Sequence, residues 1–458
     1  MAAPAAPAPS TNEYAPTADT WDHVVRAVGH TRHLGAAAAL MCATREHAHD
    51  AELLWLTRAV RGGGMERETL LVRAARRLDV ARVGEILAAC PTPASRAELL
   101  ACGDRIDRTA LHWVCQPRKE RHKERALALV ELLLGAGADP LARARCTFIE
   151  SQPIHLAARW SARLVQRLVQ AGASIDGDVA GASTLCEAAV ARTALGVRMI
   201  PTLVALGARK TLGRTVMYDF AACPVKGVPP SDGDVAAAIK ALKRVGCSLT
   251  RPGYRGKSPL DLAADKGNSP VVRALLARGV AATASSLAHA VAHPGVVRQL
   301  LAAGAPVEGL TSLRLFDGGS TTPLIEAART VHLESLQLLL GAGANVNACD
   351  EHGRAALMIA LRSQSADIAA ILGVVEALLA AGANVATRDS DGNTPLHHLA
   401  AVPHARPCTW AAAAARLLLD SGADGRIENN AGQTPAQAVP ATARGGELHR
   451  LLLEAAGA

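Results

Sequence analysis

The chain has 458 residues, half of them hydrophobic, while Phe, Trp and Tyr together make up only 2%. This composition provides enough apolar residues for a core, but the shortage of aromatic residues argues against one broad globular core and favours thin layers of short Ala- and Leu-rich helices. The formal net charge of +8 is mild for this length and does not require a nucleic-acid partner.

Cysteine usage and the N-terminal sequence indicate the compartment. Ten Cys are scattered through helix-like segments, where most are expected to be small buried hydrophobic residues. This usage favours a reducing compartment. Residues 1–20 are rich in Ala and Pro, lack the profile of a signal peptide and are predicted to be a disordered tail. No apolar run approaches the ~20 residues that span a bilayer. We therefore expect a soluble monomer in the cytoplasm or the nucleus, with no membrane and no nucleic-acid partner.

Residues 21–62 contain three short apolar stretches at helical spacing. The first contains Val24, Val25 and Val28, the second Leu40 with Met41-Cys42, and the third Leu54-Trp55. The middle helix that ends in Met41-Cys42 and the closing Leu54-Trp55, with Cys42 and Trp55 13 positions apart, resemble an F-box. An opening Leu-Pro and a Trp shortly after the Cys, both usual in that family, are absent. The alternative is a helical cap that shields the start of the following array.

The stretch from Ser320 to Asp350 shows the unit that most of the remaining chain repeats. Thr322 is suited to cap a helix whose first residue is Pro323. One apolar face follows in that helix, and a second helix has another, made of Leu333, Leu336, Leu339 and Leu340. Gly343 is expected to leave the second helix in a left-handed conformation. The pattern T-P-L, A-A, L-L and G-A resembles an ankyrin repeat.

A glycine recurs after each second helix, about every 33 to 40 residues with one shorter interval. These glycines are Gly137, Gly172, Gly207, Gly246, Gly279, Gly304, Gly343, Gly382 and Gly422. The resemblance implies an all-α ankyrin-repeat solenoid of stacked helix pairs with finger loops over residues 67–458. About ten to eleven units are expected, and residues 211–249 keep only the outline of the motif. We predict that this degenerate unit opens first, because repeat stability depends on each unit and its neighbours.

Ankyrin proteins bind other proteins along their inner helices and finger loops. The resemblance places the Leu and Ala of T-P-L-H-x-A-A-x-x in the core and the x positions in solvent. The predicted partner-binding residues at x positions are Trp113, Leu156, Arg159, Trp160, Leu262, Glu326, Arg329 and His398. Trp and Arg dominate binding hot spots, so Trp113 and Trp160 are the main candidates. The alternative is that either Trp packs against its own finger loop.

A basic run interrupts one repeat at residues 117–125. Its cations are Arg118, Lys119, Arg121, Lys123 and Arg125, and Glu120 and Glu124 lie among them. We interpret the run either as a patch for nuclear import or an acidic partner, or as a solvated extension of a helix.

Motifs for catalysis and cofactor binding are absent from the sequence. The chain has no Walker-type phosphate loop, no G-x-S-x-G elbow and no C-x-x-C pair. His397 is expected to brace its finger loop by hydrogen bonding rather than to bind metal. We therefore predict no catalytic residue, no metal, no cofactor and no enzymatic activity.

Together the two resemblances imply a non-catalytic interaction protein. An F-box-like segment would bind a Skp-type adaptor and, through it, the cullin of a cullin-RING ubiquitin ligase, while the repeats hold a target protein. In this interpretation Val24, Val25, Val28, Leu40, Cys42, Leu54 and Trp55 form the adaptor-binding surface or the core of the box. The alternative is a plain ankyrin scaffold or inhibitor without a link to ubiquitin.

Overall fold

The computed structural model describes residues 69–90, 93–104, 106–116, 120–146, 149–176, 183–191, 193–209, 216–223, 230–253, 256–311, 320–363, 367–401 and 409–457. The predicted tail over residues 1–20 and the segment over residues 21–62 lie outside the described residues. So do the seven residues assigned to the F-box-like segment, Val24, Val25, Val28, Leu40, Cys42, Leu54 and Trp55. Those assignments stay predictions.

The chain forms two compact units, the first ending at Phe148 and the second beginning at Ile149. In unit 1, α4 packs on α7 and α5 packs on α8. The elements of unit 1 are α4 (Leu70–Arg77), α5 (Val80–Ala88), α6 (Pro93–Ala101), α7 (Ala110–Cys115), η2 (Glu120–His122), α8 (Lys123–Gly135) and β1 (Ala144–Cys146). Helix α6 was not predicted from the sequence, and neither was the division into two units.

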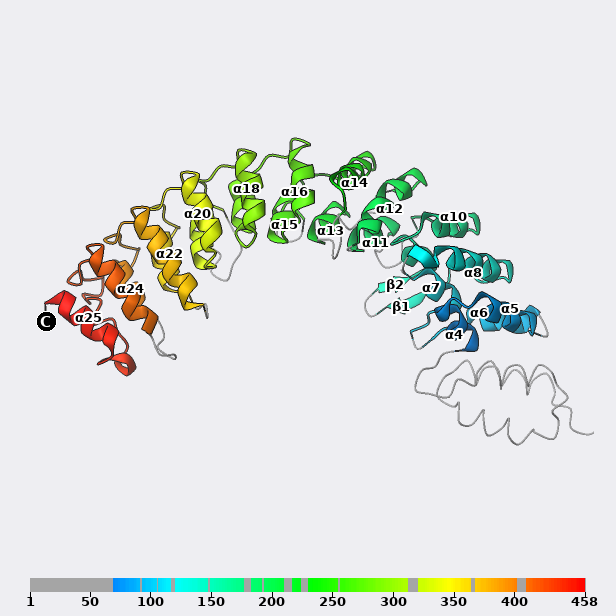
Figure 1. The fold of residues 1–458 in the computed structure, drawn as a ribbon, viewed down its shortest axis with the longest axis horizontal. Helices are drawn as coiled ribbons and strands as arrows, with labels where there is room; N and C mark the ends of the chain where they lie inside the picture. The colour runs from blue at the N-terminus through cyan, green and yellow to red at the C-terminus, as the bar shows by residue number, and fades with distance from the viewer. Residues whose placement is uncertain are drawn as a thin grey trace, which may run out of the picture. The chain divides into compact units, whose positions relative to one another are not determined.

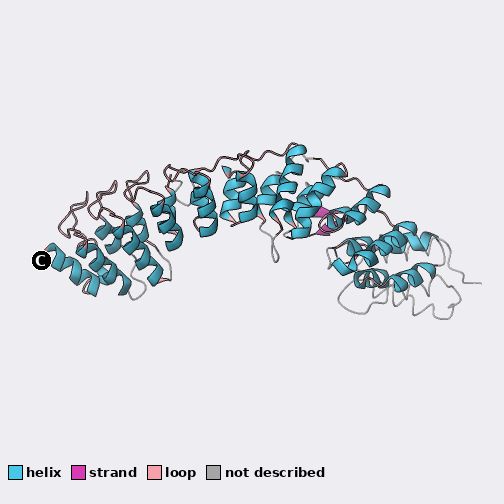
Figure 2. Ribbon diagram, turned by 45° about the horizontal axis from the view of Figure 1, so that its top comes forward, coloured by secondary structure: helices cyan, strands magenta, loops and turns pink. Residues whose placement is uncertain are grey.

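Unit 2 begins with a short strand, β2 (Ile149–Ser151), and continues as helix pairs. The pairs are α9 (Pro153–Ala157) with α10 (Ala162–Gln170), α11 (Thr184–Val190) with α12 (Ala194–Ala205), α13 (Val216–Ala222) with α14 (Asp232–Arg244), α15 (Pro259–Asp265) with α16 (Ser269–Leu276), α17 (Ala284–Ala290) with α18 (Pro294–Ala302), α19 (Pro323–Arg329) with α20 (Leu333–Gly341), α21 (Ala356–Leu361) with α22 (Ile368–Ala380), and α23 (Pro395–Ala400) with α24 (Thr409–Asp420). The short helix η4 (Ala441–Ala443) and α25 (Glu447–Ala456) follow. Figure 2 shows how little of the described chain is strand, and the predicted all-α class is confirmed.

The helices of unit 2 form two layers. The first helices of successive pairs, here called inner helices, contact one another from α9 to α23, and the second helices, here called outer helices, do so from α10 to α24. Figure 1 shows the pairs of unit 2 in a curved row, with α11, α13 and α15 on the inside of the curve. The segment before each inner helix is called the finger loop. Each repeat therefore contacts mainly its sequence neighbours, as in other repeat architectures.

The repeat at residues 320–350 follows its predicted pattern. The backbone N–H of Ile325 donates to Thr322 Oγ1 at 3.2 Å, and Pro323 occupies the first turn of α19. Leu336 and Leu339 of α20 are fully buried, and burying such a side chain contributes about 1.5–3 kcal/mol. Gly343 has a φ of 88°, the left-handed conformation expected for it. The other eight recurring glycines also have positive φ.

Side chains also join one repeat to the next in the segments that follow the outer helices. In each case an acidic or amide side chain accepts a hydrogen bond from a backbone N–H one repeat later. The bonds are Arg209 N–H to Asp176 Oδ1 at 2.7 Å, Asn345 N–H to Glu308 Oε1 at 2.6 Å, and Asn384 N–H to Asn347 Oδ1 at 2.8 Å. These bonds satisfy backbone groups that leave the helices, and they set the spacing of neighbouring repeats.

The degenerate stretch at residues 211–249 still forms a repeat. Its helix α13 packs between the inner helices α11 and α15, and its helix α14 packs between α12 and α16. Phe220 of α13 is buried in this repeat and is 3% exposed. Ser231 caps α14, where it accepts a hydrogen bond from the Asp234 N–H at 3.1 Å. The local motif has weakened, but the burial pattern that stacks a repeat is kept.

Among the described residues, no helix combines the length and apolar character needed to cross a membrane.

Candidate functional site

The inner helices and finger loops were predicted to form the binding face, but five of the eight predicted residues are buried. The exposed fractions are 6% for Leu156, 1% for Trp160, 5% for Leu262, 5% for Glu326 and 7% for His398. The expectation that these side chains face solvent is wrong. Adjacent inner helices pack so closely that each covers the flank of the next, and those flanks include the x positions. Trp160, in the turn after α9, therefore belongs to the core and not to a contact surface.

The two predicted arginines are accessible, and both are paired with a glutamate. Arg329 Nε donates to Glu326 Oε2 of the same helix at 2.8 Å. Arg159 donates from Nε and Nη2 to Glu187 Oε2 at 2.8 and 2.5 Å, and this contact joins the finger side of α9 to α11. Sequence reasoning missed Glu187, because its partner is 28 residues away. Both arginines can still offer part of the guanidinium to a ligand.

Trp113 is the predicted hot-spot residue that stays partly exposed. Its indole N–H donates to Asp104 Oδ2 of its own finger loop at 3.0 Å. The guanidinium carbons of Arg76 and Arg108 lie 5.5 and 5.4 Å from the ring centroid, within range of cation–π attraction. The alternative considered from the sequence, packing on its own finger loop, therefore describes Trp113. The contact fixes the ring without burying it.

Asp104 is one of four residues that organise finger loops in the same way. In each loop one side-chain oxygen accepts the backbone N–H groups two and four residues later. For Asp104 these donors are Ile106 and Arg108, both at 3.0 Å, and the same geometry recurs at Asp350, Asp389 and Asn429. For Asp104, Asp350 and Asp389, the residue lies five positions before the residue that precedes the helix, a spacing in the sequence that could have revealed it.

The second carboxylate oxygen of the finger-loop Asp binds a different side chain in each repeat. At Asp389 that partner is His398, with Nε2 2.7 Å from Oδ2 and both side chains almost fully buried. Burial lowers the pKa of His398 below the ordinary histidine value, although Asp389 acts in the opposite direction. Burial alone would raise the pKa of Asp389, but hydrogen bonds from Asn393 and the proximity of His398 hold it below its usual range. His398 is thus a structural partner of its loop.

His397 braces its finger loop as predicted. Its Nδ1 accepts the Thr394 N–H at 3.1 Å, and its Nε2 lies 2.8 Å from the carbonyl oxygen of Gln433 in the next repeat. Burial lowers the pKa of His397, while the bond to Gln433 acts in the opposite direction. The ring therefore links two finger loops in its neutral form.

The middle repeats carry a mixed group of charges at the end of α15. Lys257 and Lys266 lie 3.5 and 3.0 Å from the carboxylate of Asp265. Burial would raise the pKa of Asp265, but the two lysines outweigh it and the pKa is lowered. His289 of the next inner helix lies close by, and burial lowers its pKa. This part of the inner surface is polar, and the charges of its lysines are partly neutralised by Asp265.

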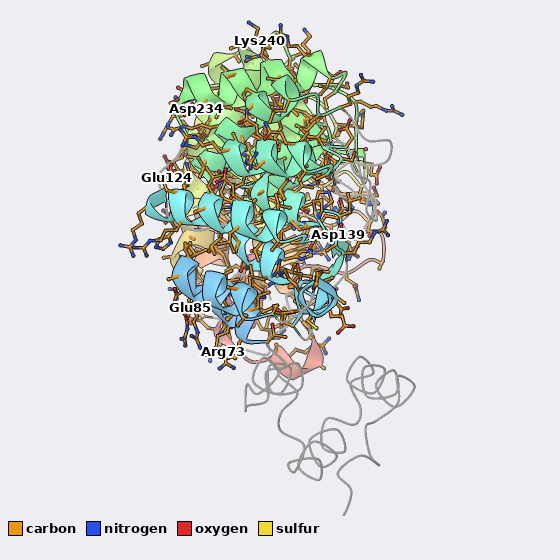
Figure 3. The ribbon with its side chains drawn as sticks, turned by 90° about the vertical axis from the view of Figure 1, so that its right-hand side faces the viewer. Arg73, Glu85, Glu124, Asp139, Asp234 and Lys240 are labelled. Carbon is orange, nitrogen blue, oxygen red and sulfur yellow. The ribbon has the colours of Figure 1, made fainter. Side chains whose placement is uncertain are left out.

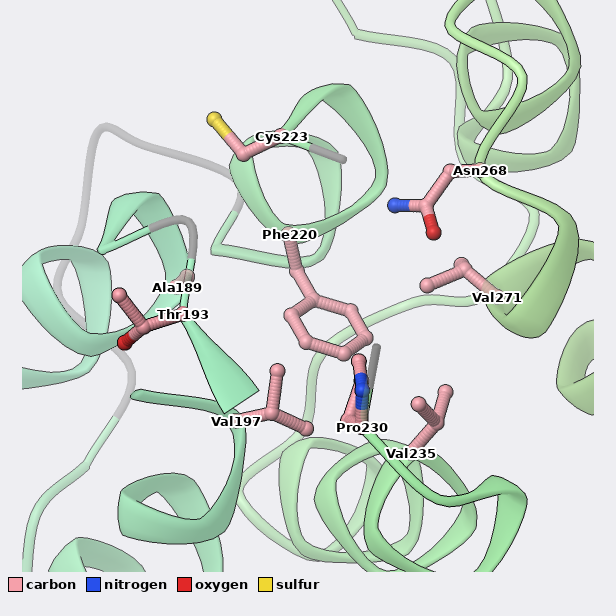
Figure 4. Close-up of a pocket in the computed structure, with 9 residues that line it drawn as sticks. All are labelled: Ala189, Thr193, Val197, Phe220, Cys223, Pro230, Val235, Asn268 and Val271. Carbon is pink, nitrogen blue, oxygen red and sulfur yellow. The ribbon is translucent and has the colours of Figure 1, made fainter. Parts of the chain in front are cut away.

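A small pocket lies in the degenerate repeat. Phe220 reaches its centre, as Figure 4 shows, with Thr193, Val197 and Val235 around the ring and Cys223 at the side. The space holds about one water molecule, far less than the ~300–1,000 Å³ of a typical small-molecule site. Within the part of the chain that the structure describes, no three His, Cys, Asp or Glu side chains gather in a way that suits a metal ion.

The family models that match this chain agree with the repeat architecture. A family model described as ankyrin repeats in three copies matches residues 287–373, and a single ankyrin-repeat model matches residues 107–145, 255–287 and 391–430. Among solved structures, the ankyrin repeat domain of Bcl-3, a member of the IkappaB protein family, is 26% identical, covers 48% of this chain and 93% of its own, and has a TM-score of 0.38. The human ASB11 ankyrin repeat domain is 22% identical, with coverages of 53% and 98% and a TM-score of 0.40.

Ankyrin repeats are domains that bind other proteins. The matched stretches fall on helix pairs in both units. Within unit 2, the helix pairs that no family model matches have the same two-layer packing as the matched pairs. The matched stretches are ankyrin repeats, and the described part of the chain has the predicted all-α fold of stacked helix pairs.

Proposed function

We propose that the chain is a non-catalytic subunit of a cullin-RING ubiquitin ligase that holds a target protein on its ankyrin repeats. The observation that supports target binding is the series of inner helices and finger loops. Within unit 2, accessible side chains such as Arg159 and Arg329 lie at the ends of two inner helices, and unit 1 presents the partly exposed Trp113. Such extended surfaces in repeat proteins suit macromolecular partners. The one-water pocket in the degenerate repeat does not suit a small-molecule substrate.

The ubiquitin part of the proposal rests on residues 21–62. There Met41-Cys42 and Leu54-Trp55 keep the F-box interval in front of the array. In this proposal the segment binds a Skp-type adaptor in the cytoplasm or nucleus, and the array positions the target near an enzyme held elsewhere in the complex. A second candidate is a plain ankyrin scaffold, which is favoured by the missing Leu-Pro at the start of the segment.

One pull-down separates these two functions. Tagged full-length chain and a variant lacking residues 21–60 are expressed in cells, and the recovered Skp-type adaptor and cullin are measured by immunoblot. We expect recovery with the full chain and loss with the deletion. A matched double substitution, Leu54→Asp with Trp55→Ala, should give the same loss while circular dichroism of the array is unchanged. Absence of adaptor from the full-length sample would rule out the ligase role and leave the scaffold.

A further inference from the structure

The excess positive charge of the chain is concentrated in its middle repeats. Residues 188–307 contain 16 Lys and Arg but only five Asp and Glu, a net charge of +11 in a chain whose total is +8. Residues 308–458 contain 10 Lys and Arg and 15 Asp and Glu. The first of these stretches includes the helices α12 to α18 of unit 2. The middle repeats are therefore basic, while the C-terminal repeats are acidic.

The five carboxylates of the middle repeats do not neutralise the cations at the end of α14. Two of them lie at the start of this helix and bind arginines of the neighbouring outer helices. Asp234 Oδ2 lies 3.0 Å from Nε of Arg198 in α12, and Asp232 Oδ1 lies 2.8 Å from Nη2 of Arg273 in α16. The other three belong to the inner helices α13 and α15; they are Asp219, Asp261 and Asp265.

Four cations gather on the outer side of α14 without a carboxylate. Lys240, Lys243 and Arg244 are exposed and stand at positions i, i+3 and i+4, on the side away from the buried residues of the helix. Arg278 follows α16, and its guanidinium donates to the carbonyl oxygen of Ala236, one helical turn before Lys240. Among the described residues, no carboxylate forms an ion pair with any of the four. We call these four residues the α14 basic patch; Lys240 is labelled in Figure 3.

Repulsion between like charges within the patch favours an anionic ligand. Side chains three and four residues apart on a helix are neighbours, with Cβ atoms about 5–6 Å apart, and like charges at this spacing destabilise the helix. Attraction to the negative end of the helix dipole accounts for Lys243 and Arg244, which lie in the last turn of α14. It does not account for Lys240, which lies earlier in the helix, or for Arg278, which comes from the next repeat. An anion bound at the patch would relieve this repulsion.

The size and composition of the patch favour a short run of carboxylates over a nucleic acid. From Ala236 to Arg244 the helix rises about 12 Å at about 1.5 Å per residue, a length that about four residues of an extended peptide cover. Helices α12, α14 and α16 contain no Phe, Tyr or Trp on which bases could stack. On either side, Arg198 and Arg273 are already paired, so the patch does not continue as a long basic stripe along a nucleic-acid backbone.

We propose that the α14 basic patch binds a short run of Asp and Glu in a partner protein. Lys240, Lys243 and Arg244 pair with successive carboxylates, and Arg278 offers the guanidinium N–H groups that its backbone contacts leave over. This surface lies on outer helices and not on the inner helices and finger loops. The proposal therefore goes beyond the proposed function and does not depend on residues 21–62.

Fluorescence anisotropy of two labelled peptides tests the proposal on the purified full-length chain. One peptide carries a run of five Glu between Gly-Ser ends, and the other carries Gln in place of every Glu. We expect the Glu peptide to bind in about 0.05 M NaCl and the Gln peptide not to bind. Binding should be lost as NaCl is raised to about 0.5 M, because the Debye length shortens about threefold.

Two variants with the same change in net charge show whether the patch is the site. Lys240→Gln with Lys243→Gln should weaken binding of the Glu peptide about fivefold, the effect of losing two exposed ion pairs. The matched control, Arg426→Gln with Arg450→Gln, removes two exposed cations of the C-terminal repeats and should bind like the wild type. Both variants should melt like the wild type, because the changed side chains are exposed. If the lysine variant melts early, Lys240→Gln alone replaces it and should weaken binding about twofold.

Several results overturn the proposal. Equal binding of the two peptides, or equal loss of binding in the lysine variant and its control, would leave only the net charge of the chain. Tighter binding of a single-stranded oligonucleotide through Lys240 and Lys243 would make the ligand a nucleic acid. A dimer in light scattering that the lysine variant abolishes would make it the acidic C-terminal repeats of a second copy. None of these results bears on adaptor recovery by residues 21–62, so the basic-patch proposal and the ligase role fail independently.

Discussion

Removal of the carboxylate of Asp389 should destabilise the C-terminal repeats more than any other change in its finger loop. The carboxylate accepts the backbone N–H groups of Asp391 at 3.0 Å and Asn393 at 2.7 Å, and it lies 2.7 Å from His398 Nε2. His398 is 7% exposed, so solvent cannot replace the lost partner. A hydrogen bond to a charged group contributes about 1.5–3 kcal/mol, and an orphaned buried group costs about 1–3 kcal/mol.

The expected loss for Asp389→Ala is about 3 kcal/mol, because relief from burying the carboxylate offsets part of the sum. Asp389→Asn should lose only about 1 kcal/mol, since the amide oxygen still accepts from the loop and the amide group can donate to a neutral imidazole. Asp391→Ala is the matched control. Its side chain is exposed in the same loop, so its change should stay within about 0.5 kcal/mol.

The assay is hydrogen exchange with mass spectrometry on peptides covering α23 and α24, supported by urea unfolding of the full chain. Local exchange is needed because a repeat array does not have to unfold as one unit. Faster exchange in α23 should follow the order Asp389→Ala, Asp389→Asn, Asp391→Ala. Equal exchange in Asp389→Ala and Asp391→Ala would refute the reasoning, because the buried carboxylate would then contribute no more than an exposed one.

Three further predictions concern pH, a glycine and the degenerate repeat. Burial lowers the pKa of His398 in the folded state, so at acidic pH the unfolded chain binds more protons than the folded chain. The free energy of unfolding should therefore fall as pH drops below about 6.5, the ordinary pKa of histidine. His398→Gln should reduce this dependence of stability on pH, measured as urea midpoints at several pH values. Gly343→Ala should destabilise the fold by about 1–2 kcal/mol, because φ is 88° and an L side chain is strained there. Gly341→Ala, in the last turn of α20 with open space for a Cβ, should stabilise the fold by up to about 1 kcal/mol. Thermal melts measure both changes. Cys223, half-buried beside the small pocket, should react with a thiol reagent sooner than fully buried Cys186, and equal rates would argue against early opening of residues 211–249.

The sequence predicted those features that depend on a few neighbouring residues. A Thr cap, a Pro in the first turn and a Gly that ends the second helix each act through local backbone chemistry. Thr322, Pro323 and Gly343 therefore behave as expected. The same local rules explain why the repeat boundaries could be followed through most of the chain. Helix α6 was missed because it is inserted between two repeats and has no place in the repeating pattern.

Solvent exposure on the inner face could not be predicted in the same way. The pattern tells which side of an inner helix faces its own partner helix, but the flanks are covered by the preceding and following repeats. Trp160 and Leu262 occupy flanks and are buried, whereas Trp113 is only partly covered. Arg159 finds Glu187 on the next inner helix, a contact that no local pattern specifies. Burial at these positions depends on side chains about one repeat away.

The finger-loop Asp shows how a repeated scaffold can acquire different surfaces. One oxygen of Asp104, Asp350 and Asp389 always holds the loop backbone, so this part of the structure is constant. The other oxygen binds an exposed-edge indole at Trp113, a guanidinium at Arg354 and a buried imidazole at His398. Trp113 and His398 both lie nine residues after their Asp, so the same helix position is partly exposed in one repeat and buried in the other, while the loop backbone is held alike in both. Trp113 and Arg354 remain partly exposed, whereas His398 is 7% exposed, so the repeat in which such a partner lies decides whether a ligand can reach it.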